Sequence, residues 1–285
     1  MKYPIGIQTF DKIIEGGYVY VDKTDLIYQL VQGSIYFLGR PRRFGKSLLV
    51  STLEQYFRGN KELFKGLAIE KLETEWKQYP VFHIDFSTGN YLNDGVLEDV
   101  LSGNLTEWET QYEVAKTSDD LGLRFQNVLR AAHQKTGLGA VVLIDEYDKP
   151  ILDVLDLDYQ VEHLGKMITL EEKHRNIMKS FYTTFKGADA DLRFVFLTGV
   201  TKFSQISMFS GFNQPDDISM DERYEALCGI TKEELYTTFD EQIKAMAVRY
   251  KVSEDEMKYK LKRKFDGYHF SPNMLDIYNP FSILN

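Results

Sequence analysis

The chain alternates between short apolar runs and longer stretches in which apolar residues recur at helical spacing. Four runs have the continuous apolar character of strands that are buried on both faces; they cover residues 35–38, 81–86, 140–145 and 192–197. Between them, residues such as Ile177, Phe181 and Phe185 recur every three or four positions, as on one face of a helix. Alternating strands and helices predict an α/β fold with a parallel sheet flanked by helices.

The pattern changes near residue 215, where helical spacing takes over. Thr231 and Ser253 each stand three residues before a glutamate, which is the capping-box signature of a helix start. We therefore expect three parts. Residues 1–34 form an N-terminal segment that packs on the core, residues 35–214 form the α/β core, and residues 215–285 form a small helical lid subdomain.

The turn after the first strand carries the strongest chemical signal. Residues 40–47 read Arg-Pro-Arg-Arg-Phe-Gly-Lys-Ser, and a strand, a turn and Gly-Lys-Ser at a helix start are the layout of a phosphate-binding loop. Backbone N–H groups there favour an anion. Gly45 allows close approach, Lys46 supplies positive charge and Ser47 can ligate Mg²⁺. The nucleotide-binding residues that we expect are Arg42, Arg43, Phe44, Gly45, Lys46, Ser47 and Leu48.

The loop departs from the usual pattern, G-x-x-x-x-G-K-[ST]. Arg40 holds the place of the first glycine, and Gly39 lies one position too early. The loop is also unusually basic. A basic turn that leads into a helix and binds no ligand would have the same tripeptide, so the flanking strand and helix are what favour a nucleotide loop.

A second signal follows about a hundred residues later, where the run 140–145 ends in two acids, Asp145 and Glu146. Ligands of open α/β sheets bind at the carboxyl ends of the strands. We expect Asp145 to hold Mg²⁺ through a water beside Ser47, and Glu146 to act as the catalytic acid that polarises a water for attack on the γ-phosphate. Alternatively, the two acids merely end a strand.

Composition narrows the classes of function. The chain has 285 residues and a net charge of −9, which argues against a general coat for nucleic acid or anionic membranes. It contains no run of membrane-spanning length. A single cysteine, Cys228, excludes an internal disulfide and fits a reducing, cytoplasmic compartment. The chain stops abruptly after 278–285, and we expect it to be the front part of a longer protein.

Several motifs together resemble the AAA-ATPase-like family of bacterial P-loop proteins. They occur in order along nearly the whole chain: PIGIQTF, YVDKT, RPRRFGKSLL, LIDEYDKP, FLTGVTKFS, CGITKEEL, DGYHF and YNPFSIL. In that family the loop without the first glycine is usual. The resemblance implies an ATP-binding protein and a C-terminal domain similar to PD-(D/E)XK nucleases, absent from this chain, through which nucleic acid could be a partner.

The resemblance also implies roles for single residues. Lys46 and Ser47 match the nucleotide loop, and Asp145 and Glu146 match the Mg²⁺-binding and catalytic acids. Thr198 ends the strand after the acidic one, where related ATPases keep a polar residue that senses the γ-phosphate, although a threonine there also suits the end of a strand. Thr201 and Lys202 are further candidates for contact with the phosphates. The segment from Pro4 to Phe10 is expected to pack on adenine.

Other polar residues fit structural roles better. His83 and Asp85 lie on the same face of a strand, and a core polar contact is favoured over a catalytic dyad. The acids Asp148, Asp153, Asp156 and Asp158 suggest a solvated loop, with Asp148 as the one to test because it is close to Glu146. Arg42 and Arg43 could contact the phosphates, the acidic strand or another subunit, and the oligomeric state is open.

The sequence thus predicts a Mg²⁺-dependent ATPase that hydrolyses ATP to ADP and phosphate. One alternative is an ATP-gated switch or sensor with very slow turnover. The other is a module that handles nucleic acid for a downstream nuclease-like domain, which the net charge of −9 disfavours.

Overall fold

A parallel sheet of five strands forms the centre of the computed structural model, which describes residues 2–201, 215–265, 267–273 and 275–284. The strand order is β2-β3-β6-β1-β7, and every neighbouring pair is parallel. The α/β fold expected from the sequence is confirmed. The strands of the sheet are β1 (Ile35–Gly39), β2 (Val81–Asp85), β3 (Ala140–Asp145), β6 (Leu192–Gly199) and β7 (Asp216–Asp217).

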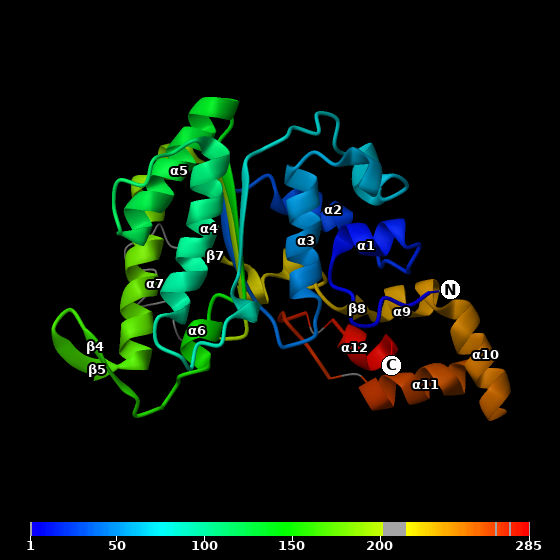
Figure 1. Cartoon of the computed structure of the whole chain (residues 1–285). Helices are drawn as coiled ribbons and strands as arrows, with labels where there is room; N and C mark the ends of the chain where they lie inside the picture. Colours follow the sequence, from blue (N-terminus) through cyan, green and yellow to red (C-terminus); the bar gives the residue numbers. More distant parts are fainter. Residues whose placement is uncertain (1, 202–214, 266, 274, 285) are drawn as a thin grey trace.

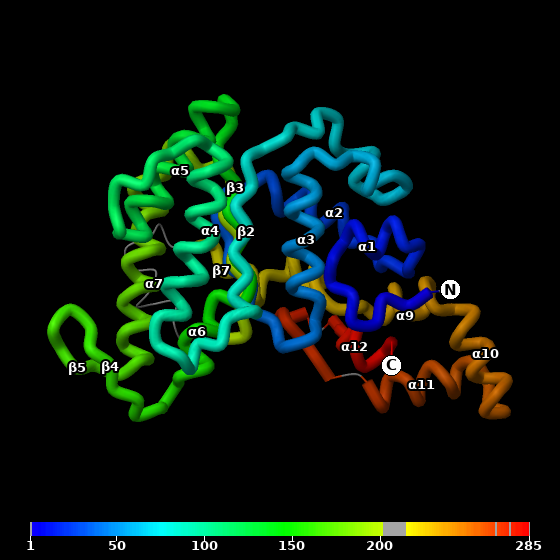
Figure 2. The backbone as a smooth tube through the Cα atoms, in the orientation of Figure 1, coloured from blue at the N-terminus to red at the C-terminus, as the bar shows by residue number. Residues whose placement is uncertain are grey.

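Helices cover both faces of this sheet (Figures 1 and 2). One face is covered by α1 (Phe10–Glu15), α2 (Thr24–Leu30) and α3 (Lys46–Phe57). The other is covered by α4 (Val96–Tyr112), α5 (Leu121–Thr136), the short α6 (Lys149–Leu152) and α7 (Leu170–Gly187).

The two cores follow from the alternation of side chains along each strand. In β3, which is buried at every position, Val142 and Ile144 point into the core below α4, α5 and α7. Val141 and Leu143 point the other way, into the core shared with α1, α2 and α3. This two-sided burial is why the strand reads as an unbroken apolar run.

The helix starts confirm the capping signals. The Ser253 hydroxyl accepts the backbone N–H of Glu256 at 3.1 Å in the first turn of α11 (Glu254–Phe265). Thr231 and Glu234 form a complete capping box in which each side chain accepts the other residue's backbone N–H. Such caps satisfy donors that the first turn of a helix leaves unpaired.

The C-terminal part is mostly helical, with α9 (Lys232–Thr238), α10 (Asp240–Tyr250), α11 (Glu254–Phe265) and α12 (Pro280–Leu284). A short antiparallel pair, β8 (Ile230–Thr231) and β9 (Ile277–Tyr278), joins its beginning to its end. The expected boundary at 214 falls just before β7. This two-residue strand pairs with β1 at the edge of the sheet, so the sheet includes residues beyond the expected boundary.

A hairpin of β4 (Gln160–His163) and β5 (Lys166–Thr169) projects beyond α7 and was not predicted from the sequence (Figure 1). Its four-residue strands are too short to give an alternating pattern. The remaining elements are 3₁₀ turns: η1 (Lys61–Phe64), η2 (Ala68–Lys71), η3 (Phe86–Thr88), η4 (Asp189–Asp191), η6 (Ile218–Met220) and η7 (Glu222–Tyr224).

Candidate functional site

The 40–47 loop connects β1 to α3 at the carboxyl end of the sheet. Gly45 has a φ of 91°, in the left-handed region that glycine adopts without a steric penalty, and α3 begins at the next residue. Arg43 also has a positive φ, of 68°. This tight turn directs the unpaired N–H groups of the first turn of α3 towards the loop, which is a geometry suited to an anion.

Lys46 is buried and bends back over the loop. Its Nζ donates to the carbonyl oxygens of Arg40 at 3.0 Å and Pro41 at 3.2 Å. Burial lowers the pKa of Lys46, whereas the nearby carboxylates of Asp145 and Glu146 oppose this shift. The amine therefore lies within electrostatic reach of both acids.

Arg40, in the place of the usual first glycine, is a buried anchor of the loop. Its guanidinium donates to the carbonyl oxygen of Ser219 at 2.6 Å and lies 4.2 Å from the ring centre of Phe270. The arginine thus fixes the loop to segments more than 170 residues away, a role that the sequence did not reveal.

Asp145 ends β3 beside Thr198, which comes from the neighbouring strand β6. The Thr198 hydroxyl donates to Asp145 Oδ1, and the Glu146 backbone N–H donates to the same oxygen at 3.1 Å. No described residue donates a hydrogen bond to Oδ2. Thr198 is fully buried, so in this arrangement it orients the carboxylate of Asp145. Its expected contact with the γ-phosphate stays a prediction.

Glu146 follows directly and has a φ of 53°, which is uncommon for a residue with a side chain. Burial raises the pKa of its carboxyl group, the charge of Asp145 adds to the increase, and Lys46 opposes it. Glu146 and Lys46 both line the same pocket. A half-buried carboxyl with a raised pKa, held in a strained backbone conformation, is typical of a functional position.

Asp148, one of the acids expected in a solvated loop, is instead buried. Its carboxylate accepts the backbone N–H groups of Val200 at 2.9 Å and Thr201 at 2.7 Å, and the Thr201 hydroxyl at 2.9 Å. Asp148 therefore ties the end of β6 to the residues after β3. Asp156 and Asp158 are exposed, as a solvated loop requires.

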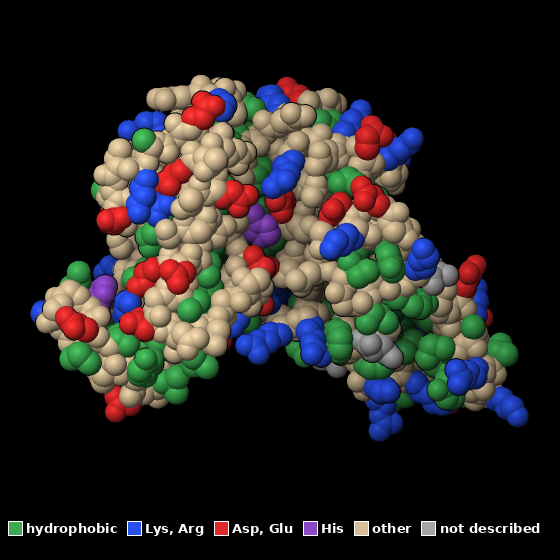
Figure 3. Space-filling model, viewed as in Figure 1, with side chains coloured by type: hydrophobic (Ala, Val, Ile, Leu, Met, Phe, Trp, Pro, Cys, Tyr) green, Lys and Arg blue, Asp and Glu red, His purple; other side chains and the backbone are tan. Residues whose placement is uncertain are grey.

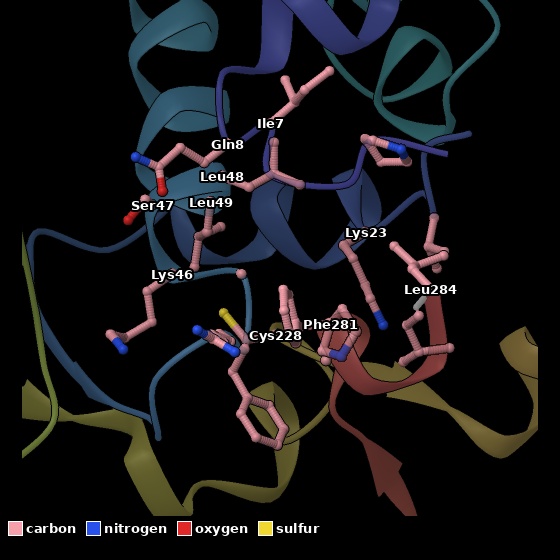
Figure 4. A pocket seen from close by; sticks show the side chains of 18 of the residues that line it. Ile7, Gln8, Lys23, Lys46, Ser47, Leu48, Leu49, Cys228, Phe281 and Leu284 are labelled. Atoms are coloured by element: carbon pink, nitrogen blue, oxygen red, sulfur yellow. The ribbon is translucent and has the colours of Figure 1, made fainter. Parts of the chain in front are cut away.

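A pocket of about 420 Å³ opens beside the 40–47 loop (Figure 4). Lys46, Ser47 and Gln8 lie on one side in the figure, and Lys23, Phe281 and Leu284 lie on the other. We call the wall around Lys46, Ser47 and Glu146 the loop end. The apolar end consists of Ile5, Ile7, Val19, Val21, Ile27, Leu227, Ile230, Phe239, Phe281 and Leu284.

Comparison with known proteins assigns the chain to a protein family. A family model described as Predicted AAA-ATPase matches residues 4–209. The chain belongs to this family. It is also 40% identical, over 99% of its length, to an uncharacterized protein in the vnfD 5'region of Azotobacter chroococcum mcd 1. The alignment covers 51% of that relative, so the chain spans about half of its length. No solved structure matches the chain.

The family assignment supports a general ATP-binding or ATPase role. None of the helices in the described part of this AAA-ATPase-like chain is long and apolar enough to span a membrane.

The apolar end brings together segments from both ends of this AAA-ATPase-like chain. The expected adenine segment contributes Pro4, Ile5, Gly6, Ile7 and Gln8 to the lining. Phe10 instead points into the core. The opposite lining, from α12 and residues 227–230, was not expected, because its apolar residues have the same appearance as ordinary core positions.

Lys23, which lines this pocket, forms an ion pair with Glu234, with Nζ 2.5 Å from Oε2. Lys23 comes from the YVDKT motif and Glu234 from the capping box of α9, 211 residues later. Burial lowers the pKa of Lys23, and the Glu234 carboxylate opposes this shift. The pair joins the N-terminal segment to α9 of the C-terminal part. In the sequence, only the presence of both motifs in the family resemblance could have indicated this contact.

The other expected loop residues take different positions. Arg43 lies over the ring of Phe281, with its guanidinium carbon 4.0 Å from the ring centre, and Arg42 also lines the pocket. In the described part of the chain, neither arginine forms an ion pair with an acid. The Phe44 ring is buried against Tyr268 and Phe270, so only its backbone can face a ligand in the pocket.

His83 and Asp85 do not form a dyad. The His83 Nδ1 lies 3.0 Å from the Glu54 carboxylate, and Asp85 accepts the backbone N–H of Ser87 at 2.7 Å. Each group therefore has its own structural partner, and the core polar contact expected for the pair is not formed. Lys202, a candidate for phosphate contact, lies outside the described residues.

Proposed function

We propose that this chain binds ATP with Mg²⁺ in the pocket and hydrolyses the ATP to ADP and phosphate. The observation that carries the proposal is that a single pocket of about 420 Å³ combines Lys46, Ser47 and Glu146 with an apolar lining. Ligand sites commonly pair such an apolar wall with a few convergent polar groups.

The loop end would hold the phosphates. The first turn of α3 and the backbone around Gly45 present N–H groups to them. Lys46 would exchange its two carbonyl partners, Arg40 and Pro41, for phosphate oxygens, and this exchange gains charge-assisted hydrogen bonds. Arg40 would keep the loop in place because its guanidinium is anchored elsewhere.

The metal site fits the donors that are present. Within the described ranges, no three His, Cys, Asp or Glu side chains gather as a metal centre of their own. Mg²⁺ bound to a nucleotide needs only one or two protein ligands, since phosphates and waters supply the others. Ser47 Oγ and Asp145 Oδ2 would be those ligands, with Thr198 orienting Asp145. When bound, Mg²⁺ would neutralise charge that develops on the phosphates.

Glu146 would accept the proton of the attacking water. Its side chain lines the pocket, and its raised pKa makes it a better base than an exposed glutamate, provided that it is ionised at the working pH. Asp148 would act indirectly, by fixing the backbone that follows β6.

The test combines thermal unfolding with phosphate release, using ATP, ADP and GTP, each with Mg²⁺ or with a chelator. A nucleotide at a hundredfold excess over its dissociation constant should stabilise the fold by about 2.7 kcal/mol. We expect ATP with Mg²⁺ to shift the melting temperature most and to release phosphate. No shift with any nucleotide would contradict the site, whereas a shift without phosphate release would identify the slow switch.

A further inference from the structure

The hairpin β4–β5 presents an unusual exposed apolar surface. Leu164 at its tip is 89% exposed and Met167 is 64% exposed, and Leu155, Leu157 and Tyr159 are exposed in the segment that leads into it. The base of the hairpin is fixed by a small cluster of buried residues, Val154, Val161 and Leu170. A contiguous apolar surface on an anchored projection is typical of a protein contact.

The conformation of the hairpin tip is energetically unfavourable in two ways. Leu164 has a φ of 51° and Gly165 a φ of 75°, so both tip residues are left-handed, as in a hairpin turn that favours Asn or Asp followed by Gly. A leucine here accepts backbone strain and exposes its side chain to water. Strain that the fold does not need suggests a role for this residue outside its own chain.

The charges around the hairpin indicate what it binds. Residues 153–169 contain four acidic residues and one lysine. The opposite character occurs in the lid, where residues 240–265 contain eight basic and five acidic residues in a chain of net charge −9. The lid also exposes apolar side chains: Val248 and Tyr250 on α10 are 79% and 61% exposed, and Tyr259 on α11 is 63% exposed.

The two surfaces lie at opposite ends of the molecule. The hairpin projects beyond α7, and the pair α10–α11 forms the far end of the lid (Figure 1). In the space-filling view, hydrophobic side chains lie at both ends, and Lys and Arg side chains gather at the lid (Figure 3). The hairpin of one copy therefore cannot reach the α10–α11 surface of the same copy.

We propose that the hairpin of one copy docks on the α10–α11 surface of a second copy. The apolar side chains of both surfaces would be buried, and the acidic flank of the hairpin would face the basic lid, which favours correct pairing and fast association. Because the two surfaces differ, the contact is head-to-tail and generates a ring or an open chain of copies.

Such a contact would connect neighbouring pockets. The hairpin follows α6, which begins directly after Asp148. The helix α10 begins one residue after Phe239, which lines the pocket. The contact would therefore join the acidic strand end of one copy to the apolar end of the next. It does not depend on ATP hydrolysis, so it can hold even where the proposed activity fails.

Sedimentation velocity of the full chain over about 1–100 μM, the range in which weak protein contacts dissociate, tests the proposal. Measurements with ATP and Mg²⁺, with ADP, and without nucleotide cover the states of the pocket. We expect the wild type to self-associate more strongly at low salt. Leu164→Asp and Val248→Asp should each weaken the association at least about tenfold, as loss of a contact hot spot does. Leu123→Asp, an exposed leucine on α5, is the matched control and should have no effect.

Mixing the two variants gives the decisive measurement. Leu164→Asp keeps an intact lid and Val248→Asp keeps an intact hairpin, so a head-to-tail contact predicts that the mixture forms heterodimers and nothing larger. A wild type that stays monomeric in every condition would overturn the proposal, as would variants that associate normally or a mixture without heterodimers. A monomer that binds single-stranded DNA, and loses it in Lys251→Glu with Arg263→Glu, would assign the basic surface to nucleic acid instead.

Discussion

The two ends of the pocket are built in different ways. The loop end takes Lys46 and Ser47 from the turn after β1, and Glu146 from the residue after β3, which β6 separates from β1 in the sheet. The apolar end takes Ile7 and Phe281 from opposite ends of the chain, and these residues line one pocket only because the C-terminal helices fold back towards the N-terminal segment. The loop end follows mainly from local motifs at strand ends, whereas the apolar end follows from packing between segments that are distant in the sequence.

Because of this difference, the two ends are expected to recognise different parts of a nucleotide. The loop end offers charge and N–H groups, which suit any polyphosphate whatever base it carries. The apolar end offers area and shape, which depend on the base. Changes at the loop end should therefore affect ATP and GTP alike, and changes at the apolar end should alter the ratio of their affinities.

The largest effect is expected at Glu146. Glu146→Gln keeps the shape of the side chain and removes the proton acceptor, so kcat should fall about 10²- to 10⁴-fold. ATP affinity should stay nearly the same. Because burial and Asp145 raise the pKa of Glu146 above 4.5, wild-type turnover should fall as the pH decreases through that raised value. The residual turnover of the variant should lack this acidic limb. Phosphate release between pH 4.5 and 8 measures both.

Normal turnover in folded Glu146→Gln would exclude Glu146 as the base and direct attention to Asp148. The matched change Asp148→Asn should lower the melting temperature, because this carboxylate accepts three hydrogen bonds from Val200 and Thr201.

The next largest effect is expected from Lys46→Ala. Loss of a charged hydrogen-bond donor to the phosphates should weaken binding by about 1.5–3 kcal/mol, which is about ten- to a hundredfold, and equally for ATP and GTP. Calorimetry with Mg²⁺ measures the two affinities. Lys65→Ala, at an exposed lysine, is the control. Unchanged affinity in a folded Lys46→Ala protein would exclude the loop as the phosphate site.

The sequence was sufficient for the sheet and the loop end because both follow from local patterns. Continuous apolar runs identified the four main strands, and Gly45, Lys46 and Asp145 lie in motifs next to strand ends. Other features depend on tertiary contacts. Lys23 meets Glu234 across 211 residues, and Arg40 meets Ser219 across 179. No spacing rule predicts such pairs.

The acid cluster shows the same limit. The acids look alike in the sequence but differ in burial. Asp148 is buried and connects the segments that follow β3 and β6, whereas Asp156 and Asp158 are exposed. The hydrogen-bond donors to Asp148 come from Val200 and Thr201, the residues that follow β6, and the sequence around the acids does not contain that information.

A smaller effect is expected from the ion pair at the apolar end. Glu234→Gln leaves the buried Lys23 charge without its partner, and should destabilise the fold by about 1–3 kcal/mol after allowance for the part-exposed glutamate. Lys23→Met removes the buried charge itself and should destabilise the fold by less than Glu234→Gln. Both changes should loosen the lid and alter the ratio of ATP to GTP affinity. Urea unfolding and calorimetry provide the two measurements. Equal weakening for both nucleotides would place Lys23 at the phosphates instead.

The smallest effect is expected at Arg43, which belongs to the loop but packs on Phe281 of the apolar end. An exposed cation–π contact contributes about 0.5–1 kcal/mol, so Arg43→Ala should reduce ATP affinity about two- to fivefold. Because Arg43 lines its own pocket, we expect turnover per chain to fall equally in dilute and concentrated protein. Phosphate release across a dilution series measures this.

Two further proteins complete this test. Arg43→Lys keeps a positive charge but lacks the planar guanidinium that stacks best on a ring, so it should recover only part of the loss. Mixing Arg43→Ala with Lys46→Ala should give no rescue if Arg43 serves its own pocket. Rescue together with turnover that rises with concentration would show that the arginine acts across a subunit boundary. The loop end would then be completed by a second copy, and the contrast between a local end and an assembled end would no longer hold.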